Sequence, residues 1–301
     1  MSNTLPYAVF GATGRTGAAA ADALLRAGLP VRVVLRDPAR GGAWAARGAE
    51  IVQADLTDAD ALTRVLTGVR GAYVVSPQQY GRADLFELAD RIAQTVARAA
   101  VAARVPKLVA LSSVGADLAS GSGWIRMNRM LEQRLSDSGI AATFLRAAYF
   151  MENWTPMIGQ AVATGGLPSF LSPAGRRIAM VAAADVGRAG AEFLVQEWTG
   201  ARAITVSGPQ PYAPKDVLAA LAAELGKPLR LDTLAQDGWA GAMAGAGFSP
   251  EALEGFIEMT RGLNSGHIGM DTDPEAEHWA GSIPLARAVG GMARAVRGAF
   301  P

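Results

Sequence analysis

The sequence contains no cysteine, which excludes disulfide bonds, thiolate metal sites and a cysteine nucleophile. It has only 2 histidines in 301 residues, and no cluster of histidine and acidic residues has metal-ligand spacing, so no metal is expected. No apolar run approaches the roughly 18 residues of a membrane-spanning helix, and the polar first residues lack a signal-peptide pattern. The lack of cysteine also fits a reducing compartment, so we expect a soluble, cytoplasmic protein away from membranes.

Strong charge of either sign is also missing. The net charge is +1 and the isoelectric point is about 8.1, so no nucleic-acid partner is expected. Half of the residues are hydrophobic and 18% are charged, which is typical of a globular protein. The length allows one or two domains, and we expect a monomer or a homodimer.

Short apolar runs alternate with helix-length amphipathic segments through the first half of the chain. Six strands are predicted, at residues 7–10, 31–35, 51–52, 72–75, 108–111 and 142–145. Helices are predicted between them at residues 15–26, 58–66, 82–103 and 124–135. Strict alternation of this kind predicts an α/β fold, a Rossmann doubly wound parallel sheet with helices on both faces.

A glycine-rich turn separates the first strand from the first helix. Its sequence, Gly11-Ala12-Thr13-Gly14-Arg15-Thr16-Gly17, has the three glycines of a dinucleotide-binding turn. The first allows a sharp turn, the second lets the backbone approach a pyrophosphate, and the third lets the helix pack close to the sheet. The helix N-terminus then offers N–H groups and a partial positive charge to phosphates. The expected contacts are Gly11, Thr13, Gly14, Arg15, Thr16 and Gly17.

The end of the second strand indicates which dinucleotide binds. About 20 residues beyond such a loop, an acidic side chain usually binds the 2′-hydroxyl of NAD. Here Leu35 is followed by Arg36, and a guanidinium at this place pairs with the 2′-phosphate of NADP. Asp37 is the competing residue, although Asp37-Pro38 also has the pattern of a helix cap and first turn. The sequence favours NADP(H).

The ends of the next strands complete the expected cofactor crevice. Asp55-Leu56 lies where the adenine would rest, although Asp55 fits a turn or cap equally well. Ser76-Pro77 ends the fourth strand near the nicotinamide ribose. Ser112 and Ser113 follow the fifth strand and should bound the nicotinamide pocket, because no histidine or acid at suitable spacing supports hydrolysis.

After about residue 150 the regular alternation ends. Glycine and proline become frequent, and strand–helix pairs are predicted only at residues 177–196 and 204–226. Ser249-Pro250-Glu251 has the order of an N-cap, a first-turn proline and an acid, and so starts another helix. We therefore expect an NADP(H)-binding domain over residues 1–150 and a smaller α+β region over 151–301 that covers the substrate.

Six segments together resemble a known family. They are residues 11–17, 33–40 (VVLRDPAR), 48–56 (GAEIVQADL), 71–77 (GAYVVSP), 108–115 (LVALSSVG) and 138–153 (SGIAATFLRAAYFMEN). They are similar to the NmrA-like, atypical short-chain dehydrogenase/reductase family, which includes quinone-oxidoreductase-like members. The resemblance covers most of residues 6–155 and implies an NADP(H)-binding Rossmann domain with a small C-terminal region over the nicotinamide. Members of the family range from NADPH-dependent reductases to cofactor sensors that perform no chemistry.

The chain departs from short-chain dehydrogenases in its acid–base residues. Those enzymes use a tyrosine and a lysine four residues later, but here the residues four after each tyrosine are Gly11, Pro77, Asp84, Asn153 and Asp216. The family often has a lysine or histidine where this chain has Asn128, whereas the acid of the next turn is retained as Glu132. Ala147 replaces a proline that is common after the family's Leu-Arg. Asparagine can orient a ribose or a carbonyl but cannot act as a general acid near pH 7.

Three residues are candidates for catalysis: Asn128, Tyr149 and His267. By the resemblance, Tyr149, Phe150 and Asn153 line the nicotinamide pocket and Asn128 contacts the ribose. Tyr80 could reach the same crevice. An isolated histidine is more often structural than catalytic, which applies to His267 and more strongly to His278.

Hydride transfer needs little from a protein beyond orientation and a water-poor pocket. A quinone or conjugated enone tolerates the loss of a tyrosine–lysine pair, because solvent can protonate its reduced form. The alkoxide of an ordinary ketone needs immediate protonation. We therefore predict an NADPH-dependent reductase of a quinone or a conjugated aromatic small molecule. A non-catalytic NADP(H) sensor that regulates a protein partner is the alternative, and an isomerase or cyclase is a third.

Overall fold

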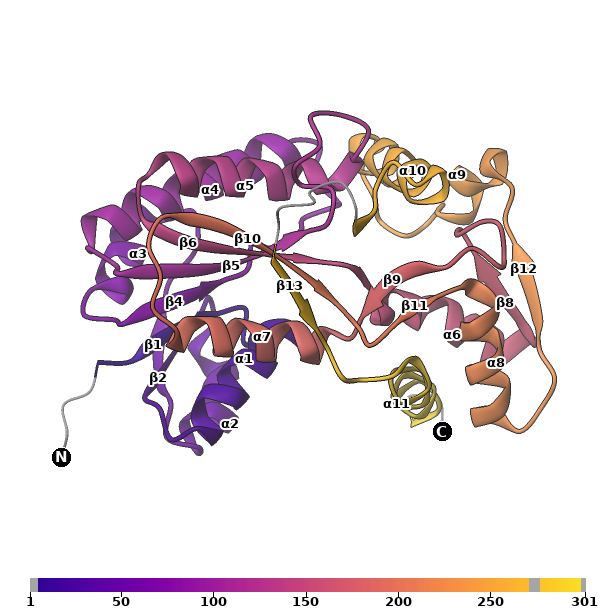
Figure 1. Ribbon diagram of the computed structural model, residues 1–301, viewed down its shortest axis with the longest axis horizontal. Helices are drawn as coiled ribbons and strands as arrows, with labels where there is room; N and C mark the ends of the chain where they lie inside the picture. Colours follow the sequence, from indigo (N-terminus) through magenta and orange to yellow (C-terminus); the bar gives the residue numbers. More distant parts are fainter. Residues whose placement is uncertain (1–4, 271–276, 299–301) are drawn as a thin grey trace.

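The computed structural model describes residues 5–270 and 277–298. One large sheet forms the centre of the half of the molecule that contains the N-terminal elements (Figure 1). Its strands run in the order β13-β10-β6-β5-β4-β1-β2-β3, and every neighbouring pair is parallel. The strands are β1 (Tyr7–Phe10), β2 (Val31–Leu35), β3 (Glu50–Gln53), β4 (Gly71–Val74), β5 (Lys107–Ser113), β6 (Ala141–Ala147), β10 (Ala201–Ser207) and β13 (Glu277–Ala280). The order reverses between β1 and β4, which confirms the predicted doubly wound Rossmann class.

The number of strands in this sheet was predicted wrongly. The described sheet has 8 strands instead of six, because β10 and β13 continue it beyond β6. The pattern around Ile204 does predict a strand, but an apolar run carries no information about which sheet it joins. The sequence of β13, EHWA, is short and half polar, so it has no strand pattern. A boundary at residue 150 remains a prediction, although the sheet itself crosses it.

Helices cover both faces of the sheet (Figure 1). One face carries α3 (Ala59–Leu66), α4 (Leu85–Ala102) and α5 (Arg126–Asp137), and the other carries α1 (Arg15–Arg26) and α7 (Ala183–Val195). The helices α1 and α7 pack so closely that a Cβ atom on Gly187 would lie 2.3 Å from the carbonyl oxygen of Thr16. The short helices of this half are η1 (Pro38–Gly41), α2 (Gly42–Ala45) and η2 (Gly123–Ile125).

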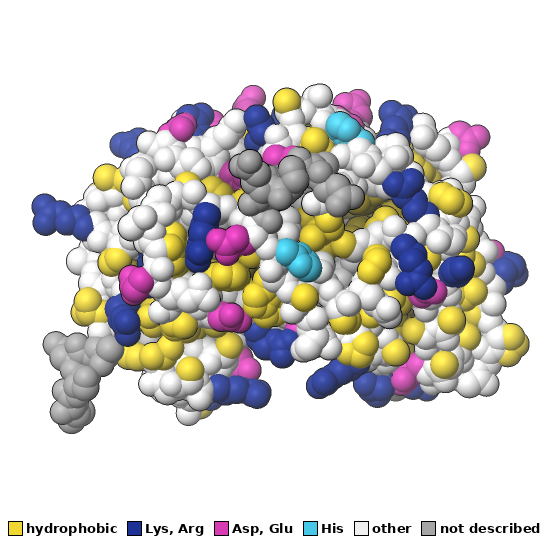
Figure 2. Space-filling view, in the orientation of Figure 1, with side chains coloured by type: hydrophobic (Ala, Val, Ile, Leu, Met, Phe, Trp, Pro, Cys, Tyr) yellow, Lys and Arg dark blue, Asp and Glu magenta, His cyan; other side chains and the backbone are white. Residues whose placement is uncertain are grey.

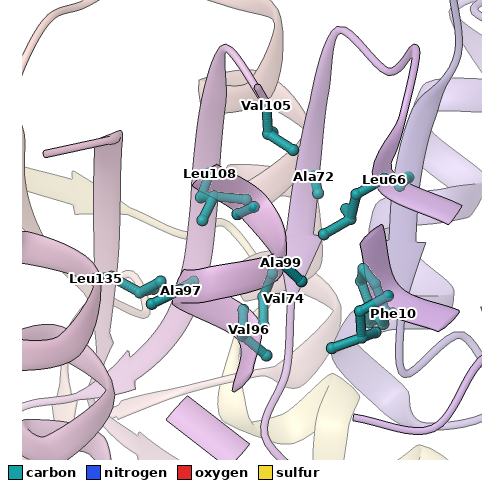
Figure 3. Close-up of a cluster of buried hydrophobic side chains, with 14 of the residues drawn as sticks. Phe10, Leu66, Ala72, Val74, Val96, Ala97, Ala99, Val105, Leu108 and Leu135 are labelled. Carbon is teal, nitrogen blue, oxygen red and sulfur yellow. The ribbon is translucent and has the colours of Figure 1, made fainter. Parts of the chain in front are cut away.

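The core under α4 explains why the strands of this sheet are apolar on both sides. Figure 3 shows Phe10 of β1, Val74 of β4 and Leu108 of β5 facing Val96 of α4. The opposite face of the same strands packs a second cluster under α1 and α7. Each fully buried aliphatic side chain contributes about 1.5–3 kcal/mol. The sheet is therefore rigid, and its carboxyl edge is a stable base for a site.

The C-terminal half builds its own core beside the sheet. Leu171, Leu221, Val289 and Trp154 lie in this cluster. It is formed by helices η3 (Met151–Trp154), α6 (Thr155–Thr164), α8 (Pro214–Leu225) and α11 (Leu285–Gly298) with two small sheets, β11-β9-β7 and β12-β8. The small strands are β7 (Tyr149–Phe150), β8 (Gly166–Ser169), β9 (Ile178–Val181), β11 (Pro211–Tyr212) and β12 (Arg230–Thr233). The helices η4 (Gln236–Gly238), α9 (Trp239–Ala242) and α10 (Pro250–Ser265) complete the described chain.

Helix ends in this half follow the predicted signals. Pro214 opens α8, and Gly226 ends it in the left-handed conformation. The side chain of Ser249 accepts a hydrogen bond from the N–H of Ala252 and so caps α10. The helix expected at residues 82–103 starts at Leu85 instead. None of the described helices combines the length and the apolar character that crossing a membrane requires.

Candidate active site

The glycine turn connects β1 to α1 with close backbone contacts. Gly11 has a positive φ of 70°, and its carbonyl accepts a hydrogen bond from the N–H of Gly14 at 2.8 Å. A Cβ atom on Gly17 would lie 2.4 Å from the carbonyl carbon of Gly11, so the helix can pack here only with glycine. A Cβ atom on Gly14 would lie 3.3 Å from the nearest described atom, and Gly14 is exposed. Gly14 therefore faces open space at the helix start.

The N-terminus of α1 has no cap of its own. Gly14 provides no side chain, and the first turn contains no acidic residue. Thr13 and Arg15 are exposed beside it, whereas Thr16 is only 7% exposed and faces the interior with Gly17. Unpaired N–H groups at an open helix start favour an anion. The geometry therefore fits a pyrophosphate, as the glycine pattern predicts.

The ends of β2 and β3 lie beside this turn, because β1, β2 and β3 are neighbours in register. Arg36 is exposed there, and its carbonyl accepts a hydrogen bond from the amide of Gln53 at 3.0 Å. The carboxylate of Asp37 accepts from the N–H of Ala39 at 3.0 Å and caps η1. Asp37 therefore has the capping role that its sequence pattern also predicts, and the contact of Arg36 with a 2′-phosphate remains a prediction.

The remaining strand ends have mixed roles. The carboxylate of Asp55 accepts from both the N–H and the hydroxyl of Thr57, and these hydrogen bonds lower the pKa of Asp55. This is the turn that the sequence offers as the alternative role for Asp55. Leu56, Ser76 and Pro77 are partly buried at the same edge. Their contacts with a cofactor remain predictions.

A cavity of about 1370 Å³ opens above the carboxyl ends of β5, β6, β10 and β13. Figure 2 shows hydrophobic side chains in the hollow near the middle of this face. The cavity brings together many of the predicted site residues: Arg15, Ser112, Ser113, Asn128, Tyr149, Phe150 and Asn153. The start of α1 and the cavity are therefore continuous through Arg15. Ligand sites of doubly wound sheets lie at this edge.

Ser112 belongs to a buried ionic network. Its hydroxyl donates to Glu132 at 2.5 Å, and Arg146 donates to both oxygens of the same carboxylate at 3.0 and 2.8 Å. All three residues are at most 8% exposed. The hydroxyl of Ser113 donates to the carbonyl of Val114 at 3.0 Å. Glu132, the acid that the family resemblance singles out, therefore holds Arg146 and Ser112 in place.

The tyrosines of the cavity are poor acids. Burial raises the pKa of Tyr149 well above its ordinary value, and a hydrogen bond with Asn153 offsets this only in part. Burial also raises the pKa of Tyr80, whose hydroxyl donates to the side chain of Gln78. A short-chain dehydrogenase needs the opposite shift. Asn128, on α5, lines the cavity as expected.

The structure places His267 away from the cavity, which contradicts its predicted role in catalysis. His267 does not line the cavity; its side chain is exposed and its Nε2 is 2.9 Å from the carbonyl oxygen of Ser120. This contact links the segment around Ser120 to the residues that follow α10. The other histidine, His278, does line the cavity, and its Nε2 is 2.8 Å from the hydroxyl of Ser207.

The sequence did not reveal the aromatic wall of the cavity. Tyr80 stacks on Trp124 with ring centroids 3.8 Å apart and planes at 21°. Phe248 meets both rings edge-on, and Phe256 packs between Trp124 and Phe170. These residues come from four distant segments, so no local pattern connects them. The indole N–H of Trp124 donates to the carbonyl of Ala252 at 2.7 Å, which holds the wall to α10.

Glu152 is a second lining residue that the sequence did not single out. Burial raises the pKa of its carboxyl, and both of its oxygens accept from the N–H of Ala183 at 3.1 Å. It therefore caps the start of α7 with a side chain from η3. No group of three or more histidine or acidic residues that could hold a metal ion occurs among residues 5–270 and 277–298.

Comparison with known families matches residues 6–239 to the model described as the NmrA-like family. The chain belongs to the NmrA-like family. This confirms the resemblance inferred from the sequence. The match ends before Phe248 and Phe256, so part of the aromatic wall lies outside the portion that the family model describes.

Two curated relatives and one solved structure illustrate what this NmrA-like protein is similar to. It is 33% identical over 262 residues to the (4-alkanoyl-5-oxo-2,5-dihydrofuran-3-yl)methyl phosphate reductase of Streptomyces griseus, covering 86% of this chain and 87% of the relative. It is 30% identical over 251 residues to the NAD(P)H azoreductase of Xenophilus azovorans, covering 81% and 82%. The NADPH complex of an Escherichia coli NADPH-dependent quinone oxidoreductase has the same fold, with a TM-score of 0.77, 24% identity and coverage of 98% and 100%.

Proposed function

We propose that this chain is an NADPH-dependent reductase that transfers hydride to a quinone or another conjugated small molecule. The observation that carries the proposal is the continuity of two features: an uncapped helix start behind Gly14 and an aromatic-walled cavity that begins at Arg15. Two relatives named as reductases support it. The site and the family support hydride transfer as the reaction. The poor proton donors Tyr149 and Asn128 support a conjugated acceptor.

The residues around the glycine turn fit NADP(H). The open α1 start accommodates the pyrophosphate, Gly14 leaves room for it, and exposed Arg36 meets the 2′-phosphate. Ser113, Asn128 and Phe150 lie on the cavity side, where they would orient the nicotinamide end. When bound, NADPH supplies a hydride from C4 of its nicotinamide ring.

The side chains of the cavity favour a conjugated acceptor over a ketone. The stacked Tyr80 and Trp124 offer a flat apolar surface, which suits a planar ring. The raised pKa of Tyr149 makes its phenol a poor proton donor, and the amide of Asn128 does not act as one. A conjugated acceptor spreads the negative charge it gains, so it can wait for a proton from water.

The test is NADPH oxidation with a panel of quinones, conjugated enones and simple ketones, followed by the loss of NADPH absorbance. Turnover of quinones or enones with little reduction of ketones is the expected result. Reduction confined to ketones would refute the acceptor class. No turnover with any acceptor, together with capture of a protein partner that depends on NADP⁺ or NADPH, would replace the enzyme with a cofactor sensor.

A further inference from the structure

Two consecutive arginines line the end of the cavity formed by the C-terminal half. Arg176 and Arg177 precede β9 and lie in the connection from β8. Both side chains line the cavity, and β9, which they precede, pairs through Met180 with Tyr149 of the predicted nicotinamide pocket.

The two arginines differ in what they already bind. Arg177 is exposed, donates to the carbonyl of Pro211 at 3.0 Å and lies 3.6 Å from the carboxylate of Asp216. Arg176 is partly buried and donates to the carbonyl of Asn264 at 2.8 Å. Within residues 5–270 and 277–298, no carboxylate forms an ion pair with Arg176. A half-buried cation without an anionic partner is costly unless something else balances its charge.

The end of α10 is shaped to hold this guanidinium. Asn264 is fixed by two hydrogen bonds, accepting from the N–H of Ser172 and donating to the carbonyl of Phe170, both at 2.9 Å. Gly266 ends the helix, and a Cβ atom there would lie 2.4 Å from a terminal nitrogen of Arg176. The helix end offers partial negative charge but takes only one of the five N–H donors of the side chain.

Among the described lining residues, no free carboxylate opposes the cation. Glu152 is the acidic residue among the cavity walls, and its carboxylate is held by the N–H of Ala183. Phe170, whose carbonyl accepts from the Asn264 amide, packs its ring edge to face against Phe256 at 5.1 Å, and both rings line the same cavity. The cavity thus combines an aromatic wall with a fixed positive charge at one end.

We propose that Arg176 binds an anionic group, a phosphate, sulfonate or carboxylate, on the conjugated substrate. The inference deepens the proposed function and rests on it. A planar acceptor lies along the aromatic wall, and its charged substituent reaches the guanidinium. The Streptomyces griseus relative, whose name describes a phosphate ester of an unsaturated lactone, is consistent with this class of substrate.

The test compares a neutral naphthoquinone with its ring-sulfonated counterpart in three forms of the protein. Arg176→Met keeps an unbranched apolar stem and removes the guanidinium and its charge. It should lower kcat/KM for the sulfonated quinone by about 10- to 100-fold, mainly through KM, and should change the neutral quinone less than about twofold. Arg177→Met is the matched control, because Arg177 is exposed and already paired with Asp216. It should leave the ratio of the two substrates unchanged.

Calorimetric binding of a naphthalenesulfonate in the presence of NADP⁺ gives a readout that needs no turnover. Loss of binding in Arg176→Met alone supports the subsite, even if neither quinone is reduced; in that case the proposed function fails and the subsite stands. Equal losses for both quinones, equal effects of the two substitutions, or unchanged naphthalenesulfonate binding would overturn the subsite. Melting temperatures of both variants show that a loss does not come from unfolding.

Discussion

The glycine turn offers backbone atoms of consecutive residues to its ligand, whereas the cavity wall takes side chains from segments far apart in the chain. Residues 11–17 form the turn before α1 and the first residues of that helix. The wall joins Tyr80, Trp124 and Phe256, which stand beyond β4, before α5 and within α10. A backbone site depends on a few glycines and is the same for every dinucleotide. A side-chain wall can change with the substrate while the sheet stays the same.

The largest effect is expected on the backbone side of this comparison. Gly14→Val would place a branched side chain at the α1 start, where a Cβ atom lies 3.3 Å from the nearest described atom, the carbonyl oxygen of Gly11. The protein should fold but lose measurable affinity for both NADPH and NADH. Circular dichroism and calorimetry check the two parts of this expectation. Gly291→Val is the control, because a Cβ atom at that helix position meets nothing within 4 Å. Normal binding in Gly14→Val would move the phosphate site elsewhere.

Substitution of Glu132 tests whether this buried acid at the cavity edge stabilises the fold. Glu132→Ala leaves Arg146 buried without its bidentate partner, so the free energy of unfolding should fall by about 3–5 kcal/mol. Chemical denaturation measures it. Replacing both residues, as Glu132→Leu with Arg146→Met, should restore much of the loss. Unchanged stability with abolished turnover would instead make Glu132 a proton donor.

Arg36 tests how far a single side chain adds specificity to the backbone site. Arg36→Ala should weaken NADPH by about 10- to 100-fold, since a charge-assisted pair contributes roughly 1.5–3 kcal/mol. Affinity for NADH should change little. Arg98→Ala, an exposed arginine of α4, is the matched control. Equal losses for both cofactors, or a wild-type preference for NADH, would contradict the role of Arg36.

Asn128 should give the smallest effect, because a neutral amide orients groups without donating a proton to the product. One such hydrogen bond contributes about 0.5–1.5 kcal/mol, so Asn128→Ala should slow turnover by no more than about tenfold. Gln133→Ala, at an exposed position of the same helix, should have no effect. A loss beyond about 100-fold would reveal a general-acid relay through Asn128.

Local patterns predicted the fold well where the physics is local. Ser249 and Gly226 mark helix ends because capping and positive φ are properties of a few neighbouring residues. The place of β13 in the sheet could not be predicted, since a four-residue strand gains its stability from the strand beside it. For the same reason the sequence suggested His267, which faces solvent, and passed over His278, whose partner Ser207 comes from another strand.

The candidate site also contains residues that local sequence predicts and residues that only the tertiary structure brings together. The turn at Gly11 and the exposed Arg36 follow from sequence order alone, and the hydrogen bond to Ala39 gives Asp37 the capping role that its pattern also predicts. The aromatic wall and the hydrogen bond from Arg176 to Asn264 depend on contacts across long stretches of chain. Such contacts carry no periodicity or spacing that a single sequence displays.

Transfer of deuterium from NADPH labelled at nicotinamide C4 to a conjugated enone tests the reductase proposal most directly. The hydride forms a carbon–hydrogen bond in the product, so the label is retained and mass spectrometry detects it. The proposed function predicts one deuterium per product molecule with one of the two C4-labelled stereoisomers and none with the other. NADPH that binds, transfers no label to any enone of the panel and is not oxidised by any quinone would contradict it.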